Sequence, residues 1–152
     1  MTDQNVERAK KLDCATLSDA MDKLAIEGVC RGIKPRDHKF RFAGRAYTVL
    51  YGPVDASEPG TVGDYVDDMK PSEIAVLDNG GREDCTVWGD ILTQFAHTRG
   101  LGGTVIDGPC RDVHLFAQLL DENGQGSRGS FRDAGSGFDR RCQGMSWRYS
   151  GW

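Results

Sequence analysis

The chain has 152 residues, of which 38% are hydrophobic and 28% charged, values that predict one soluble globular domain with a single core. Its formal net charge is −4, so no excess of positive charge favours nucleic acid as the main partner. The five cysteines form no CxxC pair, which argues against a disulfide framework or structural zinc site and favours a cytoplasmic location.

The N-terminal part predicts one helix and one strand. Its first residues lack an apolar run, and no segment approaches the ~20 apolar residues that span a bilayer, so we expect neither a signal peptide nor membrane association. An amphipathic helix is predicted over residues 16–25, capped by Thr16 or Ser18 and ended by Gly28. Its apolar face would consist of Leu17, Ala20, Met21 and Leu24. Alternation of residue types predicts a strand over 42–51.

The middle of the chain predicts a βαβ unit. After a short helix over 62–69, a continuous apolar run at 74–77 predicts a buried strand. A helix over 90–99 and a second buried strand at 104–106 follow, and 113–120 is again helical in pattern. We expect the apolar face of the middle helix to contain Ile91, Leu92, Phe95 and Ala96. This order predicts a parallel sheet.

The composition changes near residue 120. The segment 120–152 contains no Ile or Val, and about half of its residues are Gly, Ser or Arg. Such a composition buries little apolar surface and predicts a loosely ordered tail. We therefore expect an α/β domain over 1–119 and an atypical tail over 120–152.

Gly89-Asp90 is the first candidate site motif. A carboxylate before a helix is commonly an N-cap, which is the simpler interpretation of Asp90. The same helix start should lie at the carboxyl edge of the sheet, where ligands bind in open α/β folds. The amides of Ile91 and Leu92 could there hold a small carboxylate, helped by the helix dipole. Both interpretations can hold together.

Arg111-Asp112 is the second candidate motif, and twenty residues separate it from Asp90. An isolated pair of this kind is usually a surface ion pair of little energetic consequence. Because it follows the next parallel strand, however, it should emerge at the same sheet edge. Asp112 suits Mg²⁺ or Mn²⁺, and Arg111 suits a carboxylate or enolate oxygen. Neighbouring Cys110 is either a thiol of lowered pKa or a small buried residue.

Together these parts suit reactions of a 2-keto acid. Such a substrate can chelate a metal through its carboxylate and keto oxygens. The metal and Arg111 would then stabilise the enolate that forms when a carbon–carbon bond breaks.

The sequence resembles the class II pyruvate aldolases typified by 4-hydroxy-4-methyl-2-oxoglutarate aldolase, and their relative, the regulator of ribonuclease activity A. The similar stretches are ATLSDAMDKL, FAGRAYTV, IAVLDNGG, VWGDIL and GTVIDGPCRDV. The spacing Gly-Asp-x20-Arg-Asp matches the signature of the aldolases, and the resemblance covers about residues 12–119.

The resemblance implies a swivelling-type α/β sandwich with a partly parallel sheet, assembled as a homotrimer with sites at subunit interfaces. Asp112 would hold the divalent cation largely through waters, and Asp90 would hold metal-bound water. Arg111 would contact the substrate and its enolate, and the turn of Gly89, Asp90, Ile91 and Leu92 would bind the pyruvyl carboxylate. The implied activity is aldol cleavage to pyruvate together with oxaloacetate decarboxylation.

The segment after residue 120 departs from that family, whose members continue into further strands. This departure leads to the hypothesis of a truncated or frameshifted copy, which could be inactive. A further alternative is a non-catalytic binding protein resembling the regulator, with ribonuclease E as its partner; the acidic balance is compatible with docking to a basic segment. The intact Gly-Asp and Arg-Asp pairs favour the lyase.

Overall fold

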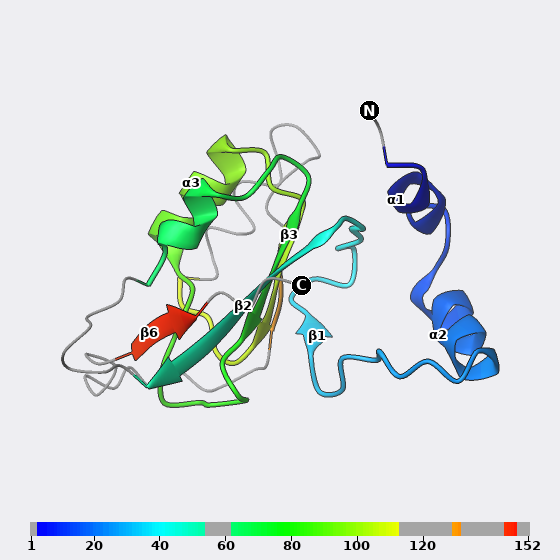
Figure 1. Cartoon of the computed structure of the whole chain (residues 1–152), viewed down its shortest axis with the longest axis horizontal. Coiled ribbons are helices and arrows are strands. Elements are labelled where there is room, and N and C mark those ends of the chain that lie inside the picture. The colour runs from blue at the N-terminus through cyan, green and yellow to red at the C-terminus, as the bar shows by residue number, and fades with distance from the viewer. Residues whose placement is uncertain (1–2, 54–61, 113–128, 132–144, 149–152) are drawn as a thin grey trace.

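A computed structural model describes residues 3–53 and 62–112, together with the strands at 129–131 and 145–148. Figure 1 shows a twisted sheet with one helix against it and two helices set apart from it. In chain order the elements are α1 (Gln4–Ala9), α2 (Cys14–Lys23), β1 (Lys34–Pro35), β2 (Ala46–Pro53), the 3-10 helix η1 (Asp64–Asp67), β3 (Ile74–Asp78), α3 (Asp90–Thr98), β4 (Gly103–Asp107), β5 (Gly129–Phe131) and β6 (Met145–Arg148).

The sheet is mixed, which confirms the predicted α/β class. Its six strands follow the order β1-β5-β4-β3-β2-β6. The inner pairs β2–β3, β3–β4 and β4–β5 are parallel, whereas β1 and β6 add antiparallel at the edges. Asp78 of β3 pairs in register with Asp107 of β4, so these strands end side by side. The loops that follow them therefore leave from one edge of the sheet.

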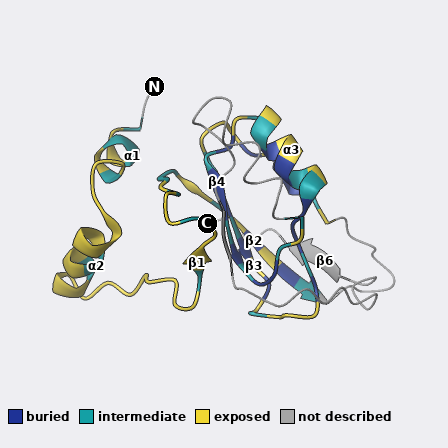
Figure 2. Ribbon diagram, turned by 180° about the vertical axis from the view of Figure 1, so that it is seen from behind, coloured by how far each residue is buried: buried dark blue, intermediate teal, exposed yellow. Residues whose placement is uncertain are grey.

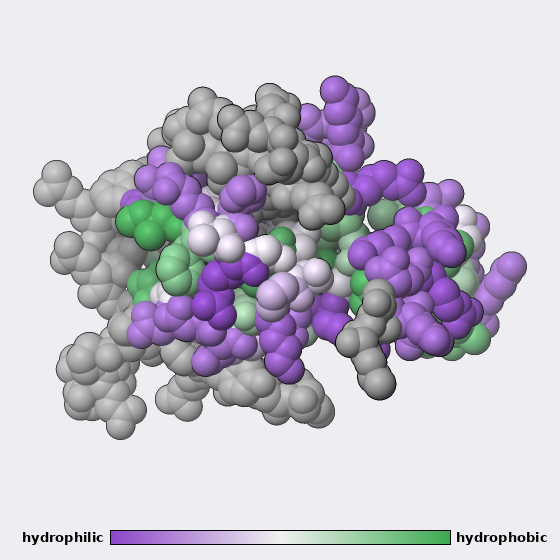
Figure 3. Space-filling model, turned by 90° about the horizontal axis from the view of Figure 1, so that it is seen from above, coloured by the Kyte–Doolittle hydropathy of each residue, from purple (hydrophilic) through white to green (hydrophobic). Residues whose placement is uncertain are grey.

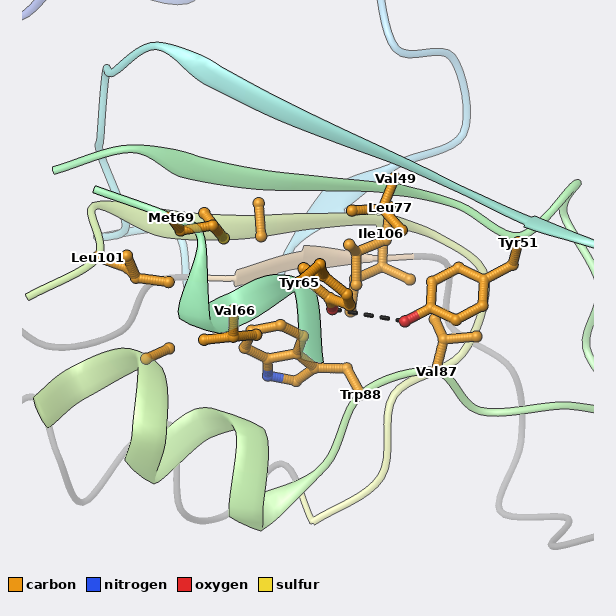
Figure 4. Packing of buried hydrophobic residues seen from close by; sticks show 12 residues of the cluster. Val49, Tyr51, Tyr65, Val66, Met69, Leu77, Val87, Trp88, Leu101 and Ile106 are labelled. Atoms are coloured by element: carbon orange, nitrogen blue, oxygen red, sulfur yellow. Dashed lines mark hydrogen bonds between the residues drawn. The ribbon is translucent and has the colours of Figure 1, made fainter. Parts of the chain in front are cut away.

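One face of the sheet is covered by α3 and η1, and the core lies between these layers (Figure 4). Tyr65 and Trp88 fill the space between helix and sheet and are almost fully buried. The Tyr51 hydroxyl donates to the Val62 carbonyl at 2.8 Å, and burial raises the pKa of Tyr51 to about 12. The cluster consists of Val49, Tyr51, Tyr65, Val66, Met69, Ala75, Leu77, Val87, Trp88, Ala96, Leu101 and Ile106.

The N-terminal part contains α1, which was not predicted, and α2, which differs from the predicted helix in its cap and its burial. Asp13, and not Thr16 or Ser18, caps α2 by accepting the Thr16 amide at 2.6 Å. The helix ends before Gly28, because Ala25 adopts a left-handed φ of 53° and the Ile26 amide returns to the Met21 carbonyl. No residue of α2 is buried, as the exposed colouring in Figure 2 shows.

The middle βαβ unit matches the prediction closely, since β3, α3 and β4 differ from it by about a residue at each end. The predicted face of α3 is partly wrong. Ala96 is buried and Leu92 packs against the core, but Ile91 and Phe95 are exposed. Hydrophobic side chains accordingly reach the surface on the side of the molecule where α3 lies (Figure 3).

The remaining predictions concern the helix over 62–69 and the chain after residue 112. The helix expected over 62–69 is the shorter 3-10 helix η1. The helix expected over 113–120 lies outside the described residues. Two segments of the atypical C-terminal region, β5 and β6, are strands of the sheet. The domain boundary between residues 1–119 and 120–152 stays a prediction. Among the described residues, no helix has the length and apolar character needed to cross a membrane.

Candidate functional site

The two candidate motifs lie against each other at the carboxyl edge of the parallel strands. Gly89 precedes α3, and Arg111 and Asp112 follow β4. A Cβ atom placed on Gly89 would lie 3.1 Å from Nε of Arg111 and 3.3 Å from Oδ2 of Asp112. A side chain at this position would require Arg111 or Asp112 to shift by a few tenths of an ångström. The structure therefore brings together the residues that the sequence placed at a common edge.

The helix start differs from the simple N-cap interpretation of Asp90. Gly89 occupies the N-cap in an extended conformation, and Asp90 is the first helical residue. Its Oδ1 accepts the amide of Ile91 at 2.8 Å, so the carboxylate still satisfies one open donor of the first turn. A substrate carboxylate that uses this amide must displace Asp90. The Ile91 side chain is 74% exposed beside it, and Leu92 turns inward against the core.

Arg111 and Asp112 form an accessible ion pair, and Asp112 has a left-handed backbone. Nε of Arg111 lies 3.3 Å from Oδ2 of Asp112, and their side chains are 51% and 36% exposed. Asp112 has a φ of 59°, in the left-handed region, which Asp enters more readily than most L-residues because its short polar side chain can bond locally. The pair combines a hard oxygen donor with a planar cation that a ligand can reach.

Beneath this surface lies a hydrogen-bond relay that the sequence analysis missed. Trp88 donates from Nε1 to Oγ1 of Thr93 at 2.9 Å, and that hydroxyl donates to the Gly89 carbonyl at 2.7 Å. The Trp88 carbonyl in turn accepts the Arg111 amide at 3.2 Å. The available signal was Thr93 in the first turn, because a helical threonine can bond the carbonyl four residues before it.

Cys110 is a partly buried thiol whose pKa is raised and not lowered. Burial raises its pKa to about 12, and the negative charge of Asp112 acts in the same direction. The positive charges of Arg36 and Arg111 lower the pKa by less than these effects raise it. The hypothesis of a lowered pKa is therefore wrong. The simpler interpretation of a small buried residue at the strand end is confirmed in part, because Cys110 is partly buried against the core.

The residues present fit a divalent cation that keeps most of its waters. Asp112 and Asp90 offer carboxylate oxygens, the donors that Mg²⁺ and Mn²⁺ prefer. Within the described segments, no group of three or more His, Cys, Asp or Glu side chains could form a closed cage. Mg²⁺ is commonly bound through one or two carboxylates and several waters, so Asp112 and Asp90 are the donors that such an ion would use.

The fold and the paired loops define a mixed α/β protein with a polar site at the carboxyl edge of its parallel strands. The chain belongs to the RraA-like family, described as Aldolase/RraA, whose model it matches over residues 14–121.

Two curated relatives extend this assignment. Protein DlpA of Legionella pneumophila is 41% identical over 103 residues, which are 65% of this chain and 16% of DlpA. A protein of Halalkalibacterium halodurans, provisionally named 4-hydroxy-4-methyl-2-oxoglutarate aldolase, is 29% identical over 116 residues, which are 75% of this chain and 52% of the relative. The chain thus spans about half or less of these relatives.

Solved structures share the fold. An uncharacterized protein from Pseudomonas syringae pv. tomato superposes with a TM-score of 0.77 at 35% identity, covering 97% of this chain and 63% of that one. Streptomyces coelicolor RraAS2, described as an unusual member of the RNase ES inhibitor RraA family, superposes with a TM-score of 0.73 at 19% identity, covering 97% of this chain and 71% of that one. The second similarity concerns the fold alone.

Proposed function

We propose that the chain is a divalent-metal-dependent carbon–carbon lyase that cleaves substrates of the 4-hydroxy-4-methyl-2-oxoglutarate type to pyruvate and decarboxylates oxaloacetate. The observation that supports this proposal is the closeness of the two motifs: a Cβ atom placed on Gly89 would lie 3.1 Å from Nε of Arg111 and 3.3 Å from Oδ2 of Asp112. Amides of a helix start, a guanidinium and a carboxylate could then act on one small ligand. A plain helix cap or a surface ion pair needs no such arrangement.

Each group has a role in this reaction. The first turn of α3, from Gly89 through Asp90 and Ile91 to Leu92, binds the carboxylate of the 2-keto acid with its amides. Arg111 donates to the oxygen on which charge develops as the carbon–carbon bond breaks. Asp112, with Asp90, holds a Mg²⁺ or Mn²⁺ ion and its waters; the cation, when bound, acts as a Lewis acid toward the keto oxygen.

Oxaloacetate gives the most direct test, since its decarboxylation yields carbon dioxide and the same pyruvate enolate. We expect pyruvate release with added Mg²⁺ or Mn²⁺ and its loss with EDTA. Asp112→Ala should lower turnover at least about 100-fold and remove the dependence on metal. Asp84→Ala is the matched control, because Asp84 pairs with Arg82 on the exposed part of the loop before α3. Turnover that survives Asp112→Ala would refute the metal role.

The second candidate is a non-catalytic binding protein that acts on a ribonuclease of the RNase E type. Its support is the shared fold of RraAS2, a member of the RNase ES inhibitor RraA family, together with the net charge of −4. Capture of a ribonuclease E scaffold segment, with no pyruvate release in the parallel assay, would favour it. We propose a homotrimer under either function, which size-exclusion chromatography with light scattering tests.

A further inference from the structure

The relay beneath the site is buried and continuous. Trp88 and Thr93 are almost completely shielded from solvent, at 2% and 0% exposure. The Thr93 hydroxyl both accepts from the Trp88 indole at 2.9 Å and donates to the Gly89 carbonyl at 2.7 Å. The Thr93 amide reaches the same carbonyl at 3.0 Å. Two donors thus hold the Gly89 carbonyl, and this fixes the peptide from which the α3 amides begin.

The relay also reaches the opposite loop. The Trp88 carbonyl accepts the Arg111 amide at 3.2 Å, so Trp88 bonds to α3 through its side chain and to the Arg111 loop through its backbone. A shift of the Trp88 backbone would therefore change the position of the Arg111 loop relative to the start of α3. Packing alone would be satisfied by Val at position 93, since Val nearly matches Thr in shape and lacks only the hydroxyl that makes these hydrogen bonds.

We infer that Trp88 and Thr93 are positioning residues of the candidate site: their side-chain hydrogen bond sets the spacing between the carboxylate-binding turn at Gly89 and the Arg111-Asp112 pair. The inference rests on the proposed function for its catalytic meaning, but its geometric content can be measured without turnover. The Thr93 hydroxyl is the group to change, because it hydrogen-bonds to both the Trp88 indole and the Gly89 carbonyl.

The test compares Thr93→Val, which replaces the hydroxyl by a methyl group, with Thr93→Ser, which keeps it. Thr104→Val is the matched control, since Thr104 is equally buried but lies at the amino end of β4. We expect amide hydrogen exchange at Arg111 to rise about threefold to tenfold in Thr93→Val, which corresponds to one lost hydrogen bond. In Thr93→Ser and Thr104→Val the Arg111 amide should exchange as in the wild type. Unchanged exchange at Arg111 in Thr93→Val, or an equal rise in Thr104→Val, would overturn the inference.

Oxalate separates this inference from the proposed function, because it is a planar analogue of the pyruvate enolate. With Mg²⁺ present, calorimetry should give a dissociation constant about tenfold weaker in Thr93→Val than in the wild type or Thr93→Ser. Equal affinity in all three proteins would overturn the positioning role. If the wild type binds no oxalate, the proposed function fails, and the exchange at Arg111 still decides whether the relay couples the two loops.

Discussion

Gly89 is the residue on which the candidate site depends most directly. Its extended φ of −159° is open to alanine, so Gly89→Ala introduces no backbone strain. The new Cβ would instead press on the side chains of Arg111 and Asp112, at 3.1 and 3.3 Å. Both side chains are flexible and partly exposed, so we expect unfolding free energy to change by less than about 1 kcal/mol. Oxaloacetate turnover should fall about tenfold or more, because the reacting groups lose their alignment.

Gly52→Ala supplies the control for this substitution. Gly52 lies in β2, and a Cβ atom there would meet nothing within 4 Å. The Gly52→Ala variant should therefore turn over oxaloacetate at the wild-type rate. Steady-state kinetics beside urea denaturation would separate the two effects. Full activity in Gly89→Ala would show that the close approach of the two loops is not needed for catalysis.

At the scale of elements, the opposite edge of the sheet depends on a close backbone approach. A Cβ atom on Gly102 would lie 2.7 Å from the Ser72 carbonyl oxygen. The Ser72 amide bonds to the Gly100 carbonyl and the Gly102 amide to the Glu73 carbonyl, each at 2.8 Å, so these segments cannot separate cheaply. We expect Gly102→Ala to lower the free energy of unfolding by about 1–3 kcal/mol in urea titrations. A loss no larger than that of Gly52→Ala would contradict this account.

The elements that the sequence predicts well are those specified by local pattern. β3, α3 and β4 have continuous apolar runs or helical periodicity bounded by glycines, and these signals require no distant partner. β1, β5 and β6 are strands of two to four residues, which exist only through pairing with strands elsewhere in the chain. The orientation of α3 was missed because Thr93, a polar residue, is buried through bonds to Trp88 and Gly89.

The candidate site follows the same division. The meeting of Gly89-Asp90 with Arg111-Asp112 could be predicted, because adjacent parallel strands deliver their following loops to one edge. The bond from Asp90 to the Ile91 amide and the left-handed backbone of Asp112 could not. Each depends on loop conformations that neither periodicity nor residue type determines. The hydrogen bonds of Trp88 to Thr93 and Arg111 could not be predicted either, since only the fold brings these residues together.

At the scale of the whole molecule, the N-terminal helices are joined to the sheet by few polar contacts. Asp3, the N-cap of α1, pairs with Arg45 immediately before β2. The guanidinium of Arg41 reaches the Leu12 carbonyl at 3.5 Å. Apolar residues of the N-terminal arm, which consists of α1 and α2 with the residue that follows them, are exposed, including Leu17 and Leu24. The positions of α1 and α2 in Figure 1 should therefore be much less stable than the sheet.

This difference leads to a prediction about pH. The Arg45 guanidinium is the largest cause that holds the pKa of Asp3 below its ordinary value. A carboxylate with a depressed pKa stabilises the folded arrangement above its unfolded pKa, and that stabilisation is lost as pH falls through the folded pKa. Acidification below that value should therefore lower the protection of the α1 amides, measured against the intrinsic exchange rate at the same pH, while β3 and β4 stay protected. Arg45→Met should produce the same pattern at neutral pH.

Hydrogen exchange followed by mass spectrometry would measure both effects on one chain. Lys10→Met is the matched control. Lys10, the C-cap of α1, pairs with Glu7 of the same helix, so the substitution removes a cation and leaves the contact to the sheet intact. Such an exposed pair contributes little, so its loss should change exchange in α1 far less than Arg45→Met does. If Arg45→Met instead accelerates exchange in β3 and β4 as well, the arm and the sheet unfold as one cooperative unit, and the Asp3–Arg45 pair contributes to the stability of the whole domain.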